Sequence, residues 1–131
     1  MQSKKEILIL DDNDDMRELL ATVLSLKGYK VTALKDIDPL TIKQKPDLVL
    51  LDVLLSGKNG IDICTAFKKS SFTKHIPVIM FSALPDARKK CISAGADEFI
   101  LKPFKVHTLH NLIENLLSKN SQSSSAEKFP A

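Results

Sequence analysis

Residues 7–15 read ILILDDNDD, a run of four aliphatic residues that leads directly into a cluster of acidic ones. Four consecutive aliphatic residues are typical of a strand that is buried on both faces. Asp11 and Asp12 follow that strand, and the next two aspartates fall where a segment of helical period begins. Carboxylates at a helix start cap free N–H groups and face the positive end of the helix dipole. We therefore assign Asp14 and Asp15 to helix capping, and the earlier pair to chemistry at the strand end.

The rest of the chain alternates short apolar runs with segments of helical period. After residues 7–10, we expect strands at 29–34, 47–52, 78–83 and 98–101, and helices at 14–27, 39–45, 61–69, 85–94 and 107–117. The second strand is polar at alternate positions, which favours a place at the sheet edge. Strands that alternate with helices form a parallel sheet, because right-handed crossovers place helices over both faces. The sequence therefore predicts an α/β fold with a doubly wound five-stranded parallel sheet.

The length of 131 residues, with 44% hydrophobic residues, suits one ordinary core. We expect residues 1–117 to form one domain, and the serine-rich residues 118–131 to form a flexible tail. The sequence shows neither a run of ~20 apolar residues nor a signal-peptide pattern, so we expect a cytoplasmic protein without a membrane span. Cys64 and Cys91 match no C-x-x-C motif and are interpreted as core residues, with a disulfide left open.

The formal net charge is +3, with acidic residues concentrated early in the chain and basic residues late. Arg88, Lys89 and Lys90 form the only run of three basic residues, and no aromatic residues are interleaved with it. No helix-turn-helix or zinc pattern accompanies this run. We therefore interpret it as a solvated helix face and expect no direct binding of nucleic acid.

Reactive side chains stand at the carboxyl ends of four predicted strands. These residues are Asp11 and Asp12 after the first strand, Asp52 after the third, Ser82 after the fourth and Lys102 after the fifth. Ligands of open parallel sheets bind outside these strand ends. Neighbouring carboxylates repel each other by about 3 to 4 kcal/mol per close pair at an effective dielectric constant near 20. The sequence therefore predicts that Lys102 and a hard divalent cation, Mg²⁺ or alternatively Mn²⁺, neutralise this edge of the sheet.

Two other acidic motifs account for the sequence less well. An EF-hand loop that began at Asp11 would need glycine at Met16 and glutamate at Thr22, so this motif is excluded. A haloacid-dehalogenase-type phosphatase also uses strand-end carboxylates, but it has a D-x-D pair and usually a longer chain, so it fits this sequence less well and is kept as an alternative. His107 and His110 have no apparent acidic or cysteine partner and are interpreted as surface residues.

Four stretches together resemble the receiver domain of two-component response regulators: ILILDDN (7–13), KPDLVLLD (45–52), HIPVIMFSA (75–83) and GADEFILKPF (95–104). The resemblance covers nearly the whole chain. It extends to single-domain regulators of the chemotaxis type, which consist of a receiver domain alone. It implies a flavodoxin-like fold with strand order 2-1-3-4-5. It also implies phosphorelay signalling, in which a histidine kinase or histidine phosphotransfer protein phosphorylates one aspartate. The family's members are not dedicated enzymes, although they slowly hydrolyse their own acyl phosphate.

The resemblance also implies a role for each residue at the strand ends. Asp52 would be the phosphoacceptor, and Asp52 and Lys102 would be the catalytic residues. The metal would be bound by Asp11, Asp12, Asp52 and the backbone carbonyl of Leu54. The phosphoryl group would be bound by Ser82 and Lys102. Ser82 and Phe99 would form the switch, with Ser82 moving toward the phosphoryl group and Phe99 turning inward behind it. The peptide bond between Lys102 and Pro103 would be cis.

The implied switch changes the face formed by residues 85–94, 98–101 and 107–117. This face would then control an unidentified downstream protein or an output domain outside this sequence, or would pair in a homodimer. The alternative function is that of a receiver-fold interaction module that acts without phosphorylation.

Three features depart from the family pattern. Leu55 and Ser56 stand where the family often has Met-Pro, and the expected second helix is short. Leu54 and Leu84 occupy positions that are often polar in the family and help admit water. We hypothesise that these two leucines shield the acyl phosphate and lengthen its lifetime.

Overall fold

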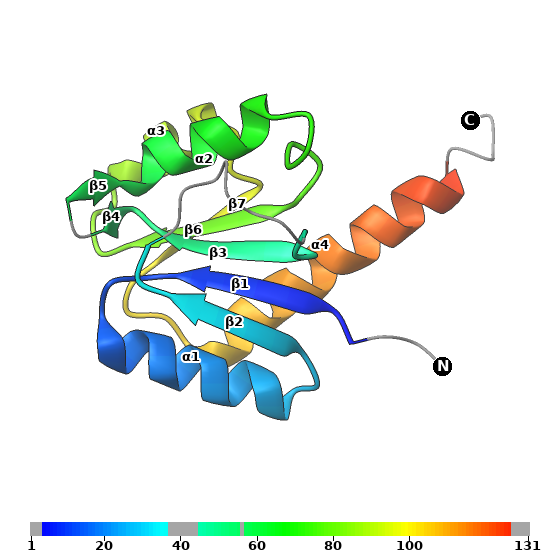
Figure 1. The fold of residues 1–131 in the computed structure, drawn as a ribbon, viewed down its shortest axis with the longest axis horizontal. Helices are drawn as coiled ribbons and strands as arrows, with labels where there is room; N and C mark the ends of the chain where they lie inside the picture. The colour runs from blue at the N-terminus through cyan, green and yellow to red at the C-terminus, as the bar shows by residue number, and fades with distance from the viewer. Residues whose placement is uncertain (1–3, 37–44, 56, 127–131) are drawn as a thin grey trace.

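The computed structural model describes residues 4–36, 45–55 and 57–126. Its main sheet contains five parallel strands in the order β2–β1–β3–β6–β7 (Figure 1). The strands are β1 (Glu6–Leu10), β2 (Lys30–Leu34), β3 (Leu48–Asp52), β6 (Val78–Ser82) and β7 (Glu98–Leu101). The order 2-1-3-4-5 expected for the five main strands is thus confirmed, and β2 lies at an edge as its polar alternation predicted.

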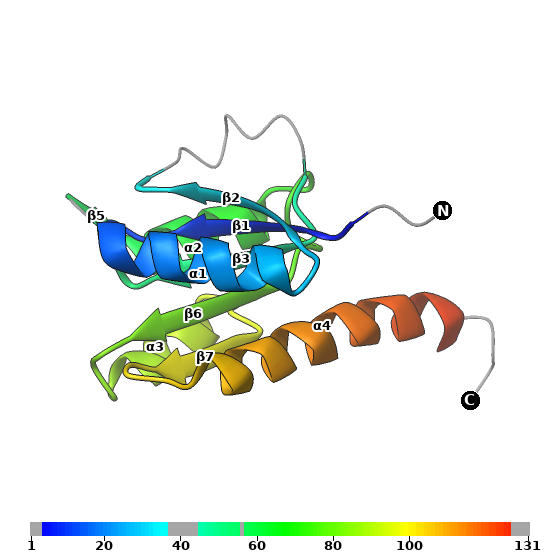
Figure 2. The ribbon, with the colours of Figure 1, turned by 90° about the horizontal axis from the view of Figure 1, so that it is seen from below.

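Helices cover both faces of the sheet (Figures 1 and 2). The described helices are α1 (Asp14–Leu26), α2 (Gly60–Lys69), α3 (Ala87–Ser93) and α4 (Val106–Ala126). Helices α2 and α3 pack on one face, and α1 and α4 pack on the other. The helix expected at 39–45 lies almost entirely outside the described residues. In the described part of the chain, no helix is both long and apolar enough to cross a membrane.

The strand residues divide the core into two layers. Leu8 and Leu10 of β1 point toward the α2 and α3 side, whereas Ile7 and Ile9 point toward the α1 and α4 side. Successive side chains of a strand lie on opposite faces, so a strand between two helical layers is apolar at every position. The ILIL run is therefore explained by burial on both faces, and it places the next residue, Asp11, at the end of a rigid central strand.

The two cysteines lie in the layer between the sheet and helices α2 and α3. Both thiols are buried and free, so the disulfide that the sequence left open is absent. Burial raises the pKa of both thiols, and that of Cys64 reaches about 11. A thiol with such a pKa is unreactive, which agrees with the prediction that these are core residues.

The start of α1 differs in one detail from the sequence prediction. Asn13 is the residue that caps the helix, because its extended backbone lets its side-chain oxygen accept from the Met16 amide at 2.8 Å. Asp14 and Asp15 instead lie in the first helical turn, near the positive end of the dipole. The helix ends at the predicted place, where Gly28 adopts a φ of 99°.

Two segments contain more regular structure than the sequence predicted. The loop after β3 forms a small antiparallel hairpin of β4 (Leu54–Leu55) and β5 (Lys58–Asn59). Helix α4 continues to Ala126, beyond the expected end of the last helix at residue 117, and projects past the side of the sheet where the strands begin (Figures 1 and 2). The continuation is possible because residues 118–126 contain no glycine or proline. The domain boundary at residue 117 stays a prediction.

Candidate functional site

The carboxyl ends of β1 and β3 bring three carboxylates together. Side-chain oxygens of Asp11, Asp12 and Asp52 all lie within 4.8 Å of one another. Asp11 and Asp12 follow β1, and Asp52 is the last residue of the adjacent strand β3. The convergence of the three side chains follows from the parallel pairing of these two central strands.

Asp11 is fully buried. One of its carboxylate oxygens, Oδ1, accepts a hydrogen bond from the Asn13 amide at 2.9 Å. The other, Oδ2, has no hydrogen-bond donor among the described residues, and the nearest cationic atom is Lys102 Nζ at 3.6 Å. An unsatisfied buried carboxylate oxygen is costly, so this atom is a ready ligand for a cation.

Asp52 is also buried, with 6% of its surface exposed. Its Oδ1 accepts from the Leu54 amide at 3.3 Å, and its Oδ2 accepts from Lys102 Nζ at 3.2 Å. Burial and, after it, the charge of the Asp11 carboxylate raise the pKa of Asp52, and Lys102 lowers it, so that the resulting pKa is about 6. At neutral pH the carboxylate is therefore mostly ionised and nucleophilic.

Lys102 enters the site from the end of β7. Its peptide bond to Pro103 is cis, as the resemblance implied, and its backbone amide donates to the Ser82 carbonyl at 2.8 Å. Its Nζ also lies 4.8 Å from the centre of the Phe81 ring. These contacts hold the ammonium between two carboxylates and an aromatic face, where it partly compensates the negative charge.

Ser82 ends β6, next to β3 in the sheet. The residue is buried, and its Oγ accepts from the Leu84 amide at 3.0 Å. That arrangement leaves the hydroxyl hydrogen to be donated to another oxygen. Ser82 and Lys102 are also linked through the backbone, so the hydroxyl and the ammonium are supplied by one connected part of the sheet edge.

The donor set fits a hard divalent cation. It consists of carboxylate oxygens from three residues, and it contains no sulfur or imidazole. Asp11, one of the three, also has a buried oxygen that lacks a hydrogen-bond donor among the described residues. Mg²⁺ prefers such oxygen ligands and keeps several waters, which the partial exposure of Asp12 permits. Asp11, Asp12 and Asp52 are thus the residues that would hold the ion. The implied participation of the Leu54 carbonyl stays a prediction.

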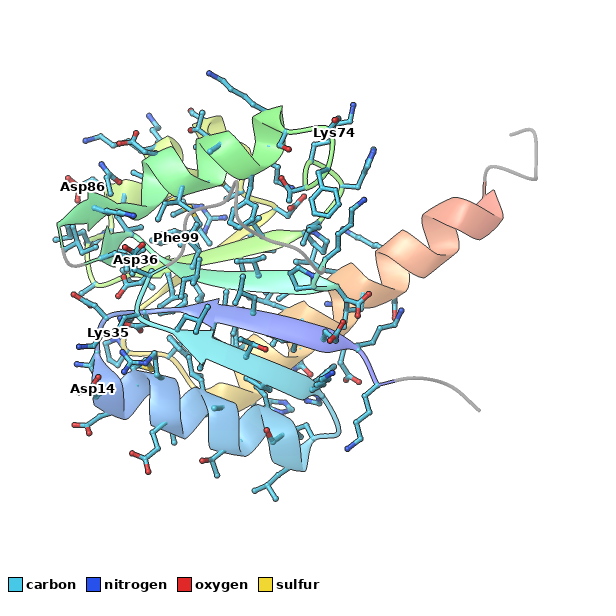
Figure 3. All side chains as sticks on the ribbon, in the orientation of Figure 1. Asp14, Lys35, Asp36, Lys74, Asp86 and Phe99 are labelled. Carbon is cyan, nitrogen blue, oxygen red and sulfur yellow. The ribbon has the colours of Figure 1, made fainter. Side chains whose placement is uncertain are left out.

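Phe99 lies on β7 but not among these charged groups. It is 7% exposed and packs in the core layer beside α2 and α3 (Figure 3). Its neighbour in the sheet is Met80 on β6. The ring already points inward in this structure, so an inward turn on activation would require a second state in which it is exposed. Its role as a switch stays a prediction.

Two basic side chains at this end of the sheet make contacts that were not anticipated from the sequence. The guanidinium of Arg17 donates to the backbone oxygen of Asp11 at 2.9 Å and forms an ion pair with Asp14. Lys58 on the β4–β5 hairpin pairs with Asp36 at 3.0 Å. Figure 3 shows Asp14, Asp36 and Asp86 at the same end of the molecule, where the strands end. The spacing of Asp14 and Arg17, three residues apart on a helix, was the available signal for their ion pair.

The raised pKa of Asp52 predicts a pH dependence of stability in metal-free protein. Because the folded pKa, about 6, lies above the unfolded value of 3.8, neutral Asp52 favours the folded state. This contribution is fully present below about pH 3.8 and is lost as the pH rises through 6. Asp52→Asn has a neutral side chain at every pH and so removes this dependence. As the pH rises from 4 to 7, the free energy of unfolding of the variant should increase by on the order of 2 to 3 kcal/mol relative to that of wild type.

The measurement is urea denaturation in a chelator at several pH values for both proteins. Groups other than Asp52 titrate in both chains, so the difference between the two curves isolates this carboxyl. Parallel curves between pH 4 and 7 would contradict the prediction.

Comparison with known proteins agrees with this geometry. The family model for the response regulator receiver domain matches residues 7–114. The chain is 36% identical over 110 residues to the phosphate regulon transcriptional regulatory protein PhoB of Pseudomonas aeruginosa, covering 80% of this chain and 48% of that protein. It is 34% identical over 122 residues to the DNA-binding response regulator MtrA of Mycolicibacterium paratuberculosis, covering 89% and 53%. The chain therefore spans about half the length of these curated relatives.

A solved structure with the same fold is the signal receiver domain of a signal transduction histidine kinase from Syntrophus aciditrophicus. It superposes with a TM-score of 0.79 at 30% sequence identity, covering 88% of this chain and 91% of that one. The five-stranded sheet and the helices around it form a flavodoxin-like fold. On the family match and the shared fold, the chain belongs to the receiver domain family of two-component response regulators.

Proposed function

We propose that this receiver domain accepts a phosphoryl group on Asp52 from a histidine kinase or a histidine phosphotransfer protein, in the presence of Mg²⁺, and thereby controls a partner. The observation that carries the proposal is the position of the Asp52 carboxylate. It is buried at the end of a central strand, in contact with Lys102 and within 4.8 Å of the oxygens of Asp11 and Asp12. Charge is concentrated where a phosphoryl group would be transferred.

In the proposed reaction, an oxygen of the ionised Asp52 carboxylate attacks phosphorus in line. The O–P bond forms as the N–P bond of the phosphohistidine breaks, and the imidazole nitrogen keeps the electron pair of that bond. Bound Mg²⁺ would supply positive charge for the phosphoryl oxygens. Lys102 shifts from the carboxylate to a phosphoryl oxygen, and the Ser82 hydroxyl donates to another.

Phosphorylation would be signalled to a partner by a change in the face formed by α3, β7 and α4. Movement of Ser82 toward the new phosphoryl group would change the loop that follows β6, since Ser82 Oγ holds the Leu84 amide. Three apolar side chains are exposed on or beside α3 and β7, namely Leu84, Ile92 and Leu101. We propose that this face binds an unidentified protein, an output domain or a second copy of the chain. Such a change is a population shift driven by the contacts of the phosphoryl group.

The proposal is tested by the intact mass of wild type and Asp52→Asn after incubation with a small phosphodonor, with and without Mg²⁺. We expect one phosphoryl group on wild type only, and only with Mg²⁺. Asp47→Asn is the matched control, because Asp47 is a carboxylate that accepts from the Glu6 amide, away from the site, and it should be modified like wild type. Failure of wild type to gain mass, without stabilisation by Mg²⁺, would favour an interaction module that acts without phosphorylation.

Leu54 and Leu84 lie beside the site, and we predict that they give the acyl phosphate a long lifetime. Leu54 is 61% exposed and follows Asp52 by two residues, and Leu84 is 49% exposed and follows Ser82 by two. Apolar side chains at these positions offer no hydrogen bond to an attacking water, so hydrolysis is expected to be slow. Leu54→Asn combined with Leu84→Glu should speed hydrolysis of the phosphorylated protein several-fold.

Decay of the phosphorylated species is followed by intact mass after removal of the donor. Ile92→Asn is the control, because Ile92 is similarly exposed at 45% but lies on α3. An unchanged decay rate in the double variant would show that the leucines do not protect the acyl phosphate.

A further inference from the structure

The segment that joins β1 to α1 carries two of the three carboxylates of the site. It is short, since β1 ends at Leu10 and α1 begins at Asp14. The amide of Asp11 donates to the Leu34 carbonyl of the neighbouring strand β2 at 3.1 Å, which fixes the amino side of this residue. The backbone carbonyl of Asp11 needs a hydrogen-bond donor from elsewhere, because the chain leaves the sheet at this point.

Arg17 supplies that contact from the second turn of α1. Its Nη1 donates to the Asp11 backbone oxygen at 2.9 Å, and its Nη2 pairs with the Asp14 carboxylate. The side chain is only 18% exposed, so its stem is held by packing. One planar guanidinium therefore links the two ends of the segment, and the fixed directions of its donors hold both partners at once.

The contacted oxygen belongs to the peptide group that joins Asp11 to Asp12. A fixed peptide plane limits the directions in which both side chains can leave the backbone. The Asn13 amide, which follows, donates to Asp11 Oδ1 at 2.9 Å and orients that carboxylate. The other oxygen, Oδ2, accepts no hydrogen bond from the described residues and lies 3.6 Å from Lys102 Nζ, which also pairs with Asp52.

We propose that Arg17 is a positioning residue for the divalent-cation site, and that it acts by fixing the peptide between Asp11 and Asp12. The inference rests on the cation site of the proposed function. It concerns affinity for the ion, not the transfer of the phosphoryl group. Groups that orient metal ligands typically change metal affinity 10- to 100-fold when they are removed.

The charge of Arg17 and its proposed positioning role predict opposite changes in Mg²⁺ affinity when the side chain is removed. Arg17 is a cation near the site, so by charge alone its removal would reduce repulsion and tighten the binding of Mg²⁺. If Arg17 positions the ligands, its removal weakens the binding of Mg²⁺. The sign of the change therefore separates the two effects.

The experiment is calorimetric titration of the full chain with Mg²⁺ for wild type, Arg17→Ala and Arg17→Lys. We expect roughly tenfold weaker binding for Arg17→Ala and an intermediate loss for Arg17→Lys, which keeps the charge but has no planar pair of donors. One control should bind like wild type: Lys27→Ala removes a positive charge at the other end of α1. Circular dichroism of each variant verifies that it is folded.

A second readout is the rate of phosphorylation by a small donor as a function of Mg²⁺ concentration. Arg17→Ala should require about tenfold more Mg²⁺ for half-saturation, with a rate at saturation close to that of wild type. Unchanged or tighter binding of Mg²⁺ in Arg17→Ala overturns the inference, whether or not phosphorylation occurs. If wild type binds Mg²⁺ and shows the Arg17 effect but gains no phosphoryl group, the proposed function fails and the inference stands. If wild type does not bind Mg²⁺, both fail.

Discussion

Gly60→Ala is expected to destabilise the protein by about 3 kcal/mol or more, because the backbone leaves no space for a side chain at this position. A Cβ atom there would lie 2.0 Å from the Asp52 carbonyl oxygen and 3.0 Å from the Val53 Cα, and both are backbone atoms that cannot rotate away. The Gly60 amide also donates to the Val53 carbonyl at 2.7 Å. The substitution would thus push the start of α2 away from the strand that carries Asp52.

The measurement is the free energy of unfolding from urea denaturation. Gly28→Ala is the matched control: it introduces the same methyl group at a glycine with a φ of 99°, but nothing lies within 4 Å of the added Cβ. The control should lose only the cost of the left-handed conformation, about 1 to 2 kcal/mol. Equal losses in the two variants would contradict the proposed steric role of Gly60.

Lys102→Met is expected to slow phosphorylation of Asp52 by about 10²-fold. Methionine keeps a long apolar stem but removes the ammonium that lies 3.2 Å from Asp52 Oδ2 and 3.6 Å from Asp11 Oδ2. During transfer, negative charge accumulates on the phosphoryl oxygens, and no other lysine or arginine side chain of the described residues is within ion-pair distance of Asp52. Loss of a fixed cation at such a position typically costs two to three orders of magnitude in rate.

The rate is measured by intact mass over time at saturating Mg²⁺. Lys105→Met removes an exposed positive charge three residues further on and should react like wild type. A rate in Lys102→Met within a few-fold of wild type would contradict the assigned role. In the absence of Mg²⁺ the same variant should also be less stable than wild type, since two buried carboxylates lose their shared counter-ion.

The sequence predicted the sheet well because the responsible signals are local and strong. Four of the main strands are nearly continuous apolar runs, which only burial between two helical layers explains. The convergence of Asp11, Asp52 and Lys102 followed from this topology, since parallel strands end at one edge. The residues at strand ends were thus predictable without any knowledge of side-chain contacts.

The remaining features depend on contacts between residues that are distant in sequence or on choices between equivalent neighbours. Asn13 rather than Asp14 caps α1, and the five polar residues in a row at 11–15 gave no basis for choosing between them. Lys58 on the β4–β5 hairpin forms an ion pair with Asp36, 22 positions earlier in the chain, and no periodicity of the sequence indicates this pair. The pKa of Asp52 depends on burial beside Asp11, and burial of a single carboxylate is known only once the strands are packed.

The claim that Asp52 is the phosphoacceptor is tested most directly by locating the modification. Wild-type protein is treated with a small phosphodonor and Mg²⁺, the acyl phosphate is reduced with borohydride, and the modified residue is identified by mass spectrometry of peptides. Reduction converts a phosphorylated aspartate into homoserine, so the position of homoserine marks the acceptor. We predict homoserine at position 52 and unmodified aspartate at positions 11 and 12. Homoserine at position 11 or 12, with Asp52 intact, would contradict the account.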